Sequence, residues 1–285
     1  MPPSPVVANW ELVLRLRQRR EELDLGIKDV ADPLGFTRNY WSAIENERKP
    51  IPANTLIAVF DILNFDDRER EELLELHEQT RVEGWWVRYS KFVDNEFQRF
   101  IGLEYAAHEI RNFGPLLIPG LLQTANYARA IMRPALSVSP IEVEQRVALR
   151  MHRQKRFNED SRVELQALMC EGTLRQQIGG VETLKGQLDH LLQVIDQHPN
   201  NFDIRVIPFA AESCTLFGGG TLSLLGFLSP RLPQLAWMET VSTWGIIAET
   251  DRVRHVTLAF DEGRKRALDR EETVKLITKI RKELR

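Results

Sequence analysis

The chain has 285 residues, with 38 lysines and arginines against 41 aspartates and glutamates, and a formal net charge of -3 at pH 7. This length suits about two domains, and the charge excludes a generally basic protein that coats nucleic acid. Cys170 and Cys214 fit no metal-ligand spacing, which indicates free thiols in a reducing cytoplasm. Because the N-terminus lacks a signal-peptide pattern and no apolar run reaches membrane-spanning length, we expect a cytoplasmic protein without membrane spans.

Residues 1–9 contain three prolines and suggest a short disordered lead. A helix is expected from about residue 10, with leucines on its apolar face and arginines around it. These arginines fit either a solvated helix face or a set of phosphate contacts, and the sequence leaves both interpretations open. They are Arg15, Arg17, Arg19 and Arg20.

Residues 25–50, LGIKDVADPLGFTRNYWSAIENERKP, predict a helix, a tight turn and a second helix. Gly35 breaks the first helix, and the Thr37 side chain can cap the second. The remaining apolar residues recur at helical spacing and should face a core. They are Val30, Ala31, Leu34, Phe36, Trp41 and Ile44.

Two short helices joined this closely cross steeply, which leaves the start of the second helix free to enter a DNA major groove. Arginine can pair with a guanine edge and asparagine with adenine, while alanine permits close approach. Hydroxyl and basic side chains nearby can bind phosphates. We therefore predict base reading by Arg38, Asn39, Tyr40 and Ala43, and backbone contacts by Thr37, Ser42, Arg48 and Lys49. The alternative is a helical hairpin without a DNA role.

The strings Gly35-Phe36-Thr37-Arg38-Asn39 and Ser42-Ala43-Ile44-Glu45-Asn46 resemble the Xre/Cro type of helix-turn-helix repressor over about residues 10–64. Three residues depart from that pattern: Ile27 replaces a frequent glutamine, Pro33 falls late in the first helix, and Glu47 replaces the usual glycine. Pro33 should end or distort its helix. Since residues 10–64 hold 8 basic and 9 acidic residues, localised DNA contacts, doubled in a dimer, are favoured over strong nonspecific binding.

Helices over residues 54–63 and 66–81 should complete a helical domain, the second as an acidic connector. We place the helix-turn-helix domain with its connector at residues 10–81 and a second domain at residues 82–285.

The second domain predicts an α+β fold. Alternating apolar and polar residues indicate strands, and longer periodic segments indicate helices. Segment 142–157 presents a basic helix face that fits either a second DNA contact or a solvated face that meets an acidic partner. Expected strands cover 163–169, 204–208, 221–227, 235–239 and 246–249; expected helices cover 142–157, 182–197, 270–284 and a segment from about residue 124.

The run Ile118-Pro119-Gly120-Leu121-Leu122-Gln123-Thr124 resembles a domain that follows the Xre-type reader in actinobacterial regulators of the Scr-type, antitoxin-like family. The resemblance implies that the chain acts like the antitoxin half of a two-gene system. Its partner would be a small protein of the developmental-regulator kind encoded nearby.

No pattern predicts catalysis, so we expect no enzyme, no cofactor and no metal. Glu104, His108 and Glu109 lie close together but supply a single imidazole. Residues 218–220 are glycines without the lysine and hydroxyl residue of a phosphate loop. An enzyme fused to a DNA anchor would require titratable residues clustered in a pocket.

The leading hypothesis is a sequence-specific transcription regulator that binds a double-stranded operator as a homodimer. Its C-terminal domain would provide dimerisation and bind the small protein partner. The alternative is a transcription factor that senses a small apolar ligand, because aromatic residues could line a pocket. These are Trp85, Trp86, Phe217, Phe227, Trp237 and Trp244.

Overall fold

The computed structural model describes residues 4–135, 138–159 and 163–285. The chain divides into two compact units, Met1–Val87 and Arg88–Arg285, here called the N-terminal and C-terminal units. The first is helical, and the second combines a six-stranded sheet with helices. The predicted fold class, an all-α domain followed by an α+β domain, is therefore confirmed.

The N-terminal unit starts with a longer helix than expected. Helix α1 begins at Pro5, so the predicted disordered lead is wrong for residues 5–9. Proline suits a first helical turn because the N–H that it lacks would have no partner there. Helix α2 ends at Ala31, before Pro33, as the proline predicted. The helices are α1 (Pro5–Glu22), α2 (Ile27–Ala31), α3 (Arg38–Glu45), α4 (Ala53–Ile62) and α5 (Asp67–Thr80).

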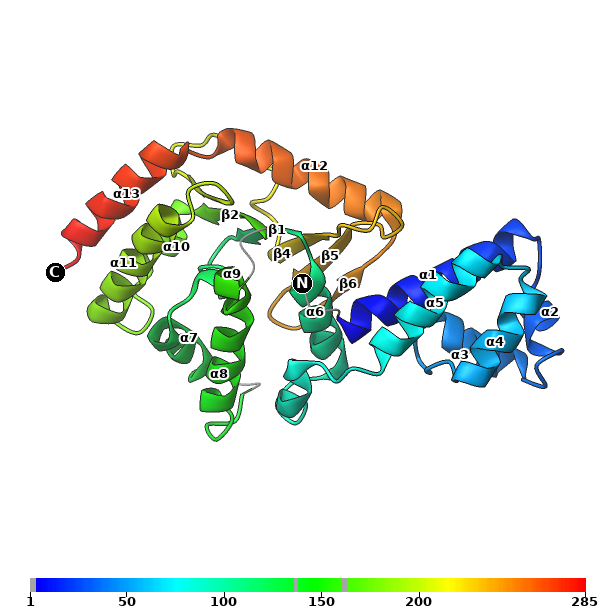
Figure 1. Ribbon diagram of the computed structural model, residues 1–285. Helices are drawn as coiled ribbons and strands as arrows, with labels where there is room; N and C mark the ends of the chain where they lie inside the picture. The colour runs from blue at the N-terminus through cyan, green and yellow to red at the C-terminus, as the bar shows by residue number, and fades with distance from the viewer. Residues whose placement is uncertain (1–3, 136–137, 160–162) are drawn as a thin grey trace. The chain divides into compact units, whose positions relative to one another are not determined.

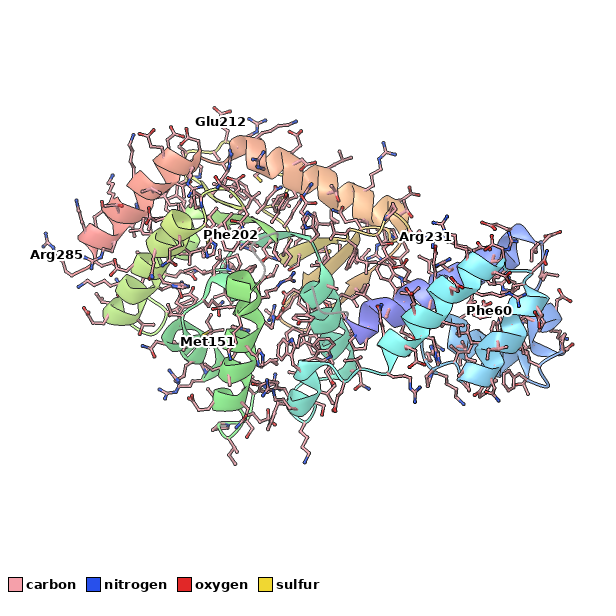
Figure 2. All side chains as sticks on the ribbon, in the orientation of Figure 1. Phe60, Met151, Phe202, Glu212, Arg231 and Arg285 are labelled. Atoms are coloured by element: carbon pink, nitrogen blue, oxygen red, sulfur yellow. The ribbon has the colours of Figure 1, made fainter. Side chains whose placement is uncertain are left out.

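One apolar core joins these helices, and Phe60 of α4 lies within it (Figure 2). Helices α1 and α5 lie side by side (Figure 1). Between them, Arg15 and Glu72 form an ion pair of 3.0 Å. The core also takes in Leu12, Leu16, Val30, Trp41, Ile44, Leu56 and Leu73.

The C-terminal unit is built on a mixed sheet with the strand order β3-β2-β1-β4-β5-β6. Strands β1, β2 and β3 run parallel, while β4, β5 and β6 are joined antiparallel to each other, and β4 is antiparallel to β1. The strands are β1 (Glu109–Gly114), β2 (Glu164–Cys170), β3 (Phe202–Ile207), β4 (Thr221–Gly226), β5 (Leu235–Glu239) and β6 (Trp244–Ile247).

Helices cover both faces of this sheet (Figure 1). On one face, Phe260 of α12 packs in a cluster with Phe113 and Leu224. On the other face, Phe100 of α6 stacks on Trp237 of β5 with ring centroids 4.6 Å apart. The helices are α6 (Asn95–Ala106), α7 (Ala125–Met132), α8 (Val143–Gln154), α9 (Arg156–Glu159), α10 (Glu171–Arg175), α11 (Val181–Gln197), α12 (Thr250–Arg266) and α13 (Arg270–Glu283), with short 3-10 helices η1 (Trp85–Tyr89) and η2 (Gly120–Leu122).

Several elements of this unit, among them α6, β1, α10 and α12, were not among the expected strands and helices. Strand β1 is the inner strand shared by the parallel and antiparallel halves of the sheet. Helix α12 was missed because its apolar positions are few and Gly263 lowers its helix propensity. That glycine has a packing reason, since a Cβ there would lie 2.5 Å from the Leu216 Cδ1 atom.

The segment Ile118–Thr124 lies almost entirely out of solvent, and glutamine side chains satisfy its backbone. Gln187 accepts from the Thr124 amide at 2.7 Å and donates to the Leu122 carbonyl at 2.8 Å. Gln154 of α8 donates to the carbonyls of Gly120 and Gln123 at 3.0 and 2.8 Å. A buried non-regular segment needs such partners, so the distinctive PGLLQT string has a structural role.

The predicted basic face of segment 142–157 is not uniformly solvated. Arg153 and Arg156 are buried. Arg153 pairs with Glu104, and Arg156 donates to the backbone carbonyls of Glu104 and Ala107. The interpretation as a solvated face is therefore wrong for these two arginines. The Glu104 carboxylate and the backbone carbonyls of Glu104 and Ala107 accept their hydrogen bonds.

A second charge cluster joins β3 to α12 and predicts acid sensitivity. Burial opposes ionisation of the Asp203 carboxyl, but hydrogen bonds from Arg205 and Arg264 hold its pKa below the usual value. This stabilisation is fully present above the unfolded-state pKa of about 3.9 and is lost as the pH falls through the lower folded-state pKa.

We expect Asp203→Asn to destabilise the protein at pH 7 and to make its loss of stability in acid shallower. Denaturant titrations at pH 7 and in the acid range measure both effects. Asp196→Asn is the matched control, since Asp196 is exposed on α11 and makes no ion pair in the part of the chain that the structure describes. Equal acid dependence in Asp203→Asn and the parent would contradict the prediction.

Candidate nucleic-acid interface

Helix α3 presents its first residues to solvent. The Thr37 hydroxyl accepts a hydrogen bond from the Tyr40 amide at 3.2 Å and so caps the helix. The side chains of Arg38 and Asn39 are exposed, while Trp41 and Ile44 on the opposite side are fully buried. The helix is thus fixed by its inner face and leaves two predicted base readers at its outer N-terminal end.

The other predicted base readers, Tyr40 and Ala43, are half-buried. The Tyr40 ring lies against Phe36, with centroids 4.5 Å apart, and the Lys49 Nζ atom lies 4.5 Å from the Tyr40 ring centroid. The geometry therefore gives Tyr40 a packing role and brings Lys49, a predicted backbone contact, next to α3. The base-reading and phosphate roles of these residues stay predictions.

A tight bend follows α3 and sets the direction of the basic residues after it. The Ala43 carbonyl accepts from the amides of Arg48 and Lys49 at 2.8 and 3.2 Å. Glu47 has a φ of 58°, a left-handed conformation that favours glycine. This agrees with the position of Glu47 at the usual glycine of the motif. Ser42 is half-buried, and its Oγ accepts from Asn46 at 3.2 Å.

The Glu45 carboxylate anchors the buried side of α3 to α1. It is buried and accepts hydrogen bonds from Arg20 Nε at 2.7 Å, Arg20 Nη2 at 3.0 Å and Trp41 Nε1 at 2.7 Å. The bond to Glu45 raises the pKa of Arg20. The α1 residue Arg17 adds a hydrogen bond to the Glu45 carbonyl. Because these bonds connect α1 to the last turn of α3, they fix the orientation of the helix.

The arginines of α1 do not form a free phosphate-binding face. Arg15 pairs with Glu72 and Arg20 with Glu45. Arg17 donates to the backbone of α3, and Arg19 donates to the carbonyls of Leu63 and Asn64 at 3.1 and 3.0 Å. These guanidinium groups hold the unit together, which favours a structural role for the cluster; phosphate contacts by the partly exposed Arg17 and Arg19 stay a prediction.

Four cations of the N-terminal unit remain exposed near the turn. They make no ion pair among the described residues, and they are Lys28, Arg38, Arg48 and Lys49. Sequence reasoning missed Lys28. The sequence signal for Lys28 was its position in the first turn of α2. It directly follows Ile27, which replaces a frequent glutamine of the repressor motif.

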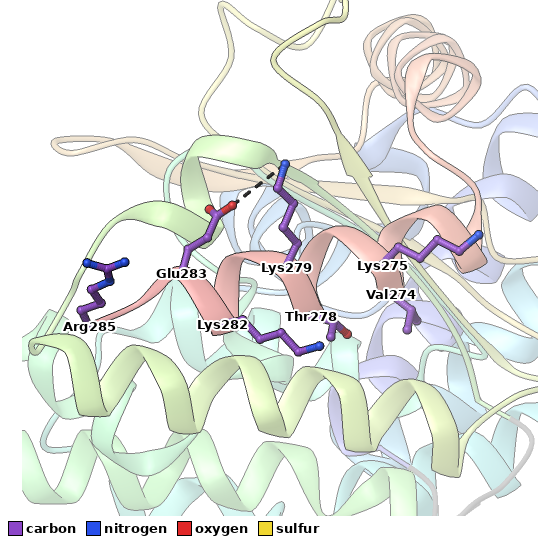
Figure 3. A pocket seen from close by; sticks show the side chains of 7 residues that line it. All are labelled: Val274, Lys275, Thr278, Lys279, Lys282, Glu283 and Arg285. Carbon is purple, nitrogen blue, oxygen red and sulfur yellow. Dashed lines mark ion pairs between the residues drawn. The ribbon is translucent and has the colours of Figure 1, made fainter.

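The aromatic residues of the ligand-sensing alternative do not line the pocket found along α13. Trp237 is buried against Phe100, whereas Trp244 is 47% exposed and donates to Asp94 at 3.1 Å. Phe217 is also half-exposed. The described pocket lies along α13 (Figure 3). Its lining consists of Val274, Lys275, Thr278, Lys279, Lys282, Glu283 and Arg285.

Glu104, His108 and Glu109 do not come together as a metal-binding group. Glu104 is bound by Arg153, and no group of three or more His, Cys, Asp or Glu side chains within the described ranges could hold a metal ion. In the same residues, no helix combines the length and apolar character needed to cross a membrane.

Comparison with known proteins gives two matches to family models. Residues 11–73 match a model described as a helix-turn-helix domain, and residues 97–279 match one described as a domain of unknown function, DUF5753. Neither the curated proteins nor the solved structures include a match.

We expect Glu45→Gln to destabilise the N-terminal unit by about 3 kcal/mol, because removing one charge of a buried pair leaves the Arg20 guanidinium with only the exposed Glu21 as a counter-ion. Chemical denaturation followed by tryptophan fluorescence and circular dichroism measures this loss. Glu21→Gln is the control, since Glu21 pairs with the same arginine at 3.4 Å but is 60% exposed. A Glu45→Gln variant as stable as Glu21→Gln would rule out the anchoring role.

Proposed function

The chain belongs to the family defined by the domain of unknown function DUF5753, and from this membership and its helix-turn-helix domain we propose how it acts as a DNA-binding regulator. It binds a double-stranded operator as a homodimer and controls transcription from that site. The C-terminal unit binds a small regulatory protein encoded nearby, and the chain has no catalytic activity of its own.

One observation supports the DNA-binding mode above all. Arg38 and Asn39 project from the exposed end of α3, while Glu45 at the other end of the helix is bonded to α1. A rigid helix with free arginine and asparagine side chains at its start suits direct readout of base edges in a major groove.

The resemblance of the PGLLQT string to Scr-type, antitoxin-like regulators supports the proposed protein partner. In this chain the string is bonded to α8 through Gln154 and to α11 through Gln187. Binding of a partner to either helix would therefore act on the same segment.

We expect Arg38→Ala to weaken binding to the preferred operator by roughly 1 to 3 kcal/mol and to relax sequence preference, because a base contact is lost. Lys49→Ala should weaken binding to all sequences about equally, because phosphates carry no sequence information. Fluorescence anisotropy with the operator and with base-substituted operators separates the two. Equal losses on every sequence for Arg38→Ala would contradict the groove assignment.

The exposed cations also predict how strongly salt weakens binding. If Lys28, Arg48 and Lys49 neutralise phosphates while Arg38 reads a base, the slope of log affinity against log salt is about -2.7 for one subunit and about -5.4 for a dimer. A salt titration of operator affinity measures the slope. A slope near the single-subunit value would contradict the homodimer.

A further inference from the structure

Helix α8 carries a row of arginines at Arg146, Arg150 and Arg153, spaced so that they share one helix face. The innermost of them, Arg153, is fully compensated. Its Nε and Nη2 atoms donate to the two oxygens of Glu104 at 2.8 and 2.7 Å, and its guanidinium lies 5.5 Å from the ring centroids of Phe97 and Phe100. Glu104 is therefore already engaged bidentately by Arg153.

Arg150 lacks such a counter-ion. Its Nη1 atom donates to Gln123 Oε1 at 2.6 Å, and the same amide group donates to the Ile118 carbonyl at 2.6 Å. The PGLLQT segment thus holds Arg150 in one orientation. Among the described residues, no carboxylate lies within ion-pair distance of Arg150, and its Nε atom is buried without an acceptor.

The surrounding charges do not make up for the missing counter-ion of Arg150. Burial and then the positive charge of Arg153 lower the pKa of Arg150 to about 10; Glu239 and Glu104 oppose this shift, and Arg146 adds slightly to it. The side chain still carries its charge at neutral pH. An uncompensated cation in a poorly solvated place is unfavourable, and a bound anion would relieve it.

One helical turn away, Arg146 is partly accessible. Its side chain is 27% exposed, and Nη2 makes one hydrogen bond of 3.3 Å to Glu142, while Nε is buried without an acceptor. Arg150 is also partly exposed. The buried Nε atoms cannot be the groups that meet a ligand, so the guanidinium ends of the two arginines would do so.

We propose that Arg146 and Arg150 of α8, with Arg150 positioned by Gln123, form a binding site for the phosphoryl group of a small molecule. Two guanidinium groups supply two positive charges and several donors, which match a phosphate dianion better than a single planar carboxylate. Limited exposure of both arginines favours a small ligand. Because Arg150 is bonded to the PGLLQT segment, the bound anion stabilises that segment.

The test uses the full chain and inorganic phosphate as the probe. Isothermal titration calorimetry with phosphate, against sodium chloride of equal ionic strength, should show saturable binding. Arg150→Gln and Arg146→Gln should each weaken it roughly tenfold or more, because each removes charged hydrogen bonds. Circular dichroism checks folding, and the Arg146→Gln variant keeps the test valid if Arg150→Gln does not fold.

Two controls locate the site. Arg129→Gln removes a partly exposed arginine of neighbouring α7 that pairs with Glu144 of α8 at 2.6 Å, and it should bind phosphate like the parent. Lys49→Ala should do so as well, which separates this site from the DNA-binding surface and makes the result independent of the proposed function. Absence of saturable phosphate binding, equal binding by all variants, or binding of succinate in preference to phosphate would overturn the proposal.

Discussion

The Glu45 carboxylate can remain buried only because Arg20 and Trp41 donate three hydrogen bonds to it. Removing a carboxylate from water is costly unless its charge is paired and its lone pairs are satisfied. Here the bonds also join the recognition helix to α1. The exposed start of α3 is consequently positioned by an interaction on the buried side of the helix.

The C-terminal unit also contains a buried carboxylate that is paired with an arginine. Glu104 of α6 accepts two hydrogen bonds from Arg153 of α8. Around that pair, glutamine side chains satisfy the buried PGLLQT segment, so the interior on this side of the sheet is polar as well as aromatic. A polar network of this kind specifies one arrangement of its helices. It also leaves α8 with more positive charge than its neighbours compensate.

Local signals in the sequence were sufficient for the helix-turn-helix. The Thr37 cap, the break at Gly35 and the spacing of Trp41 and Ile44 all act within a few residues, so their structural roles could be predicted. The α1 arginines could not be assigned, because a charge pattern does not reveal that Arg20 meets Glu45 across the core. Helix α12 escaped prediction since its contacts are with a sheet that assembles from distant segments, and the structure likewise supplied the strand order.

Strand β1 imposes a constraint on how the protein is made. Its residue Glu109 is paired on one side with Glu164 and on the other with Gly226, both far downstream in the chain. During synthesis, β1 emerges well before either neighbour and keeps a free hydrogen-bonding edge until β4 is available. Such edges are prone to pair with other chains. The nascent protein is therefore most exposed to aggregation between the synthesis of β1 and that of β4, which favours chaperone binding in that interval.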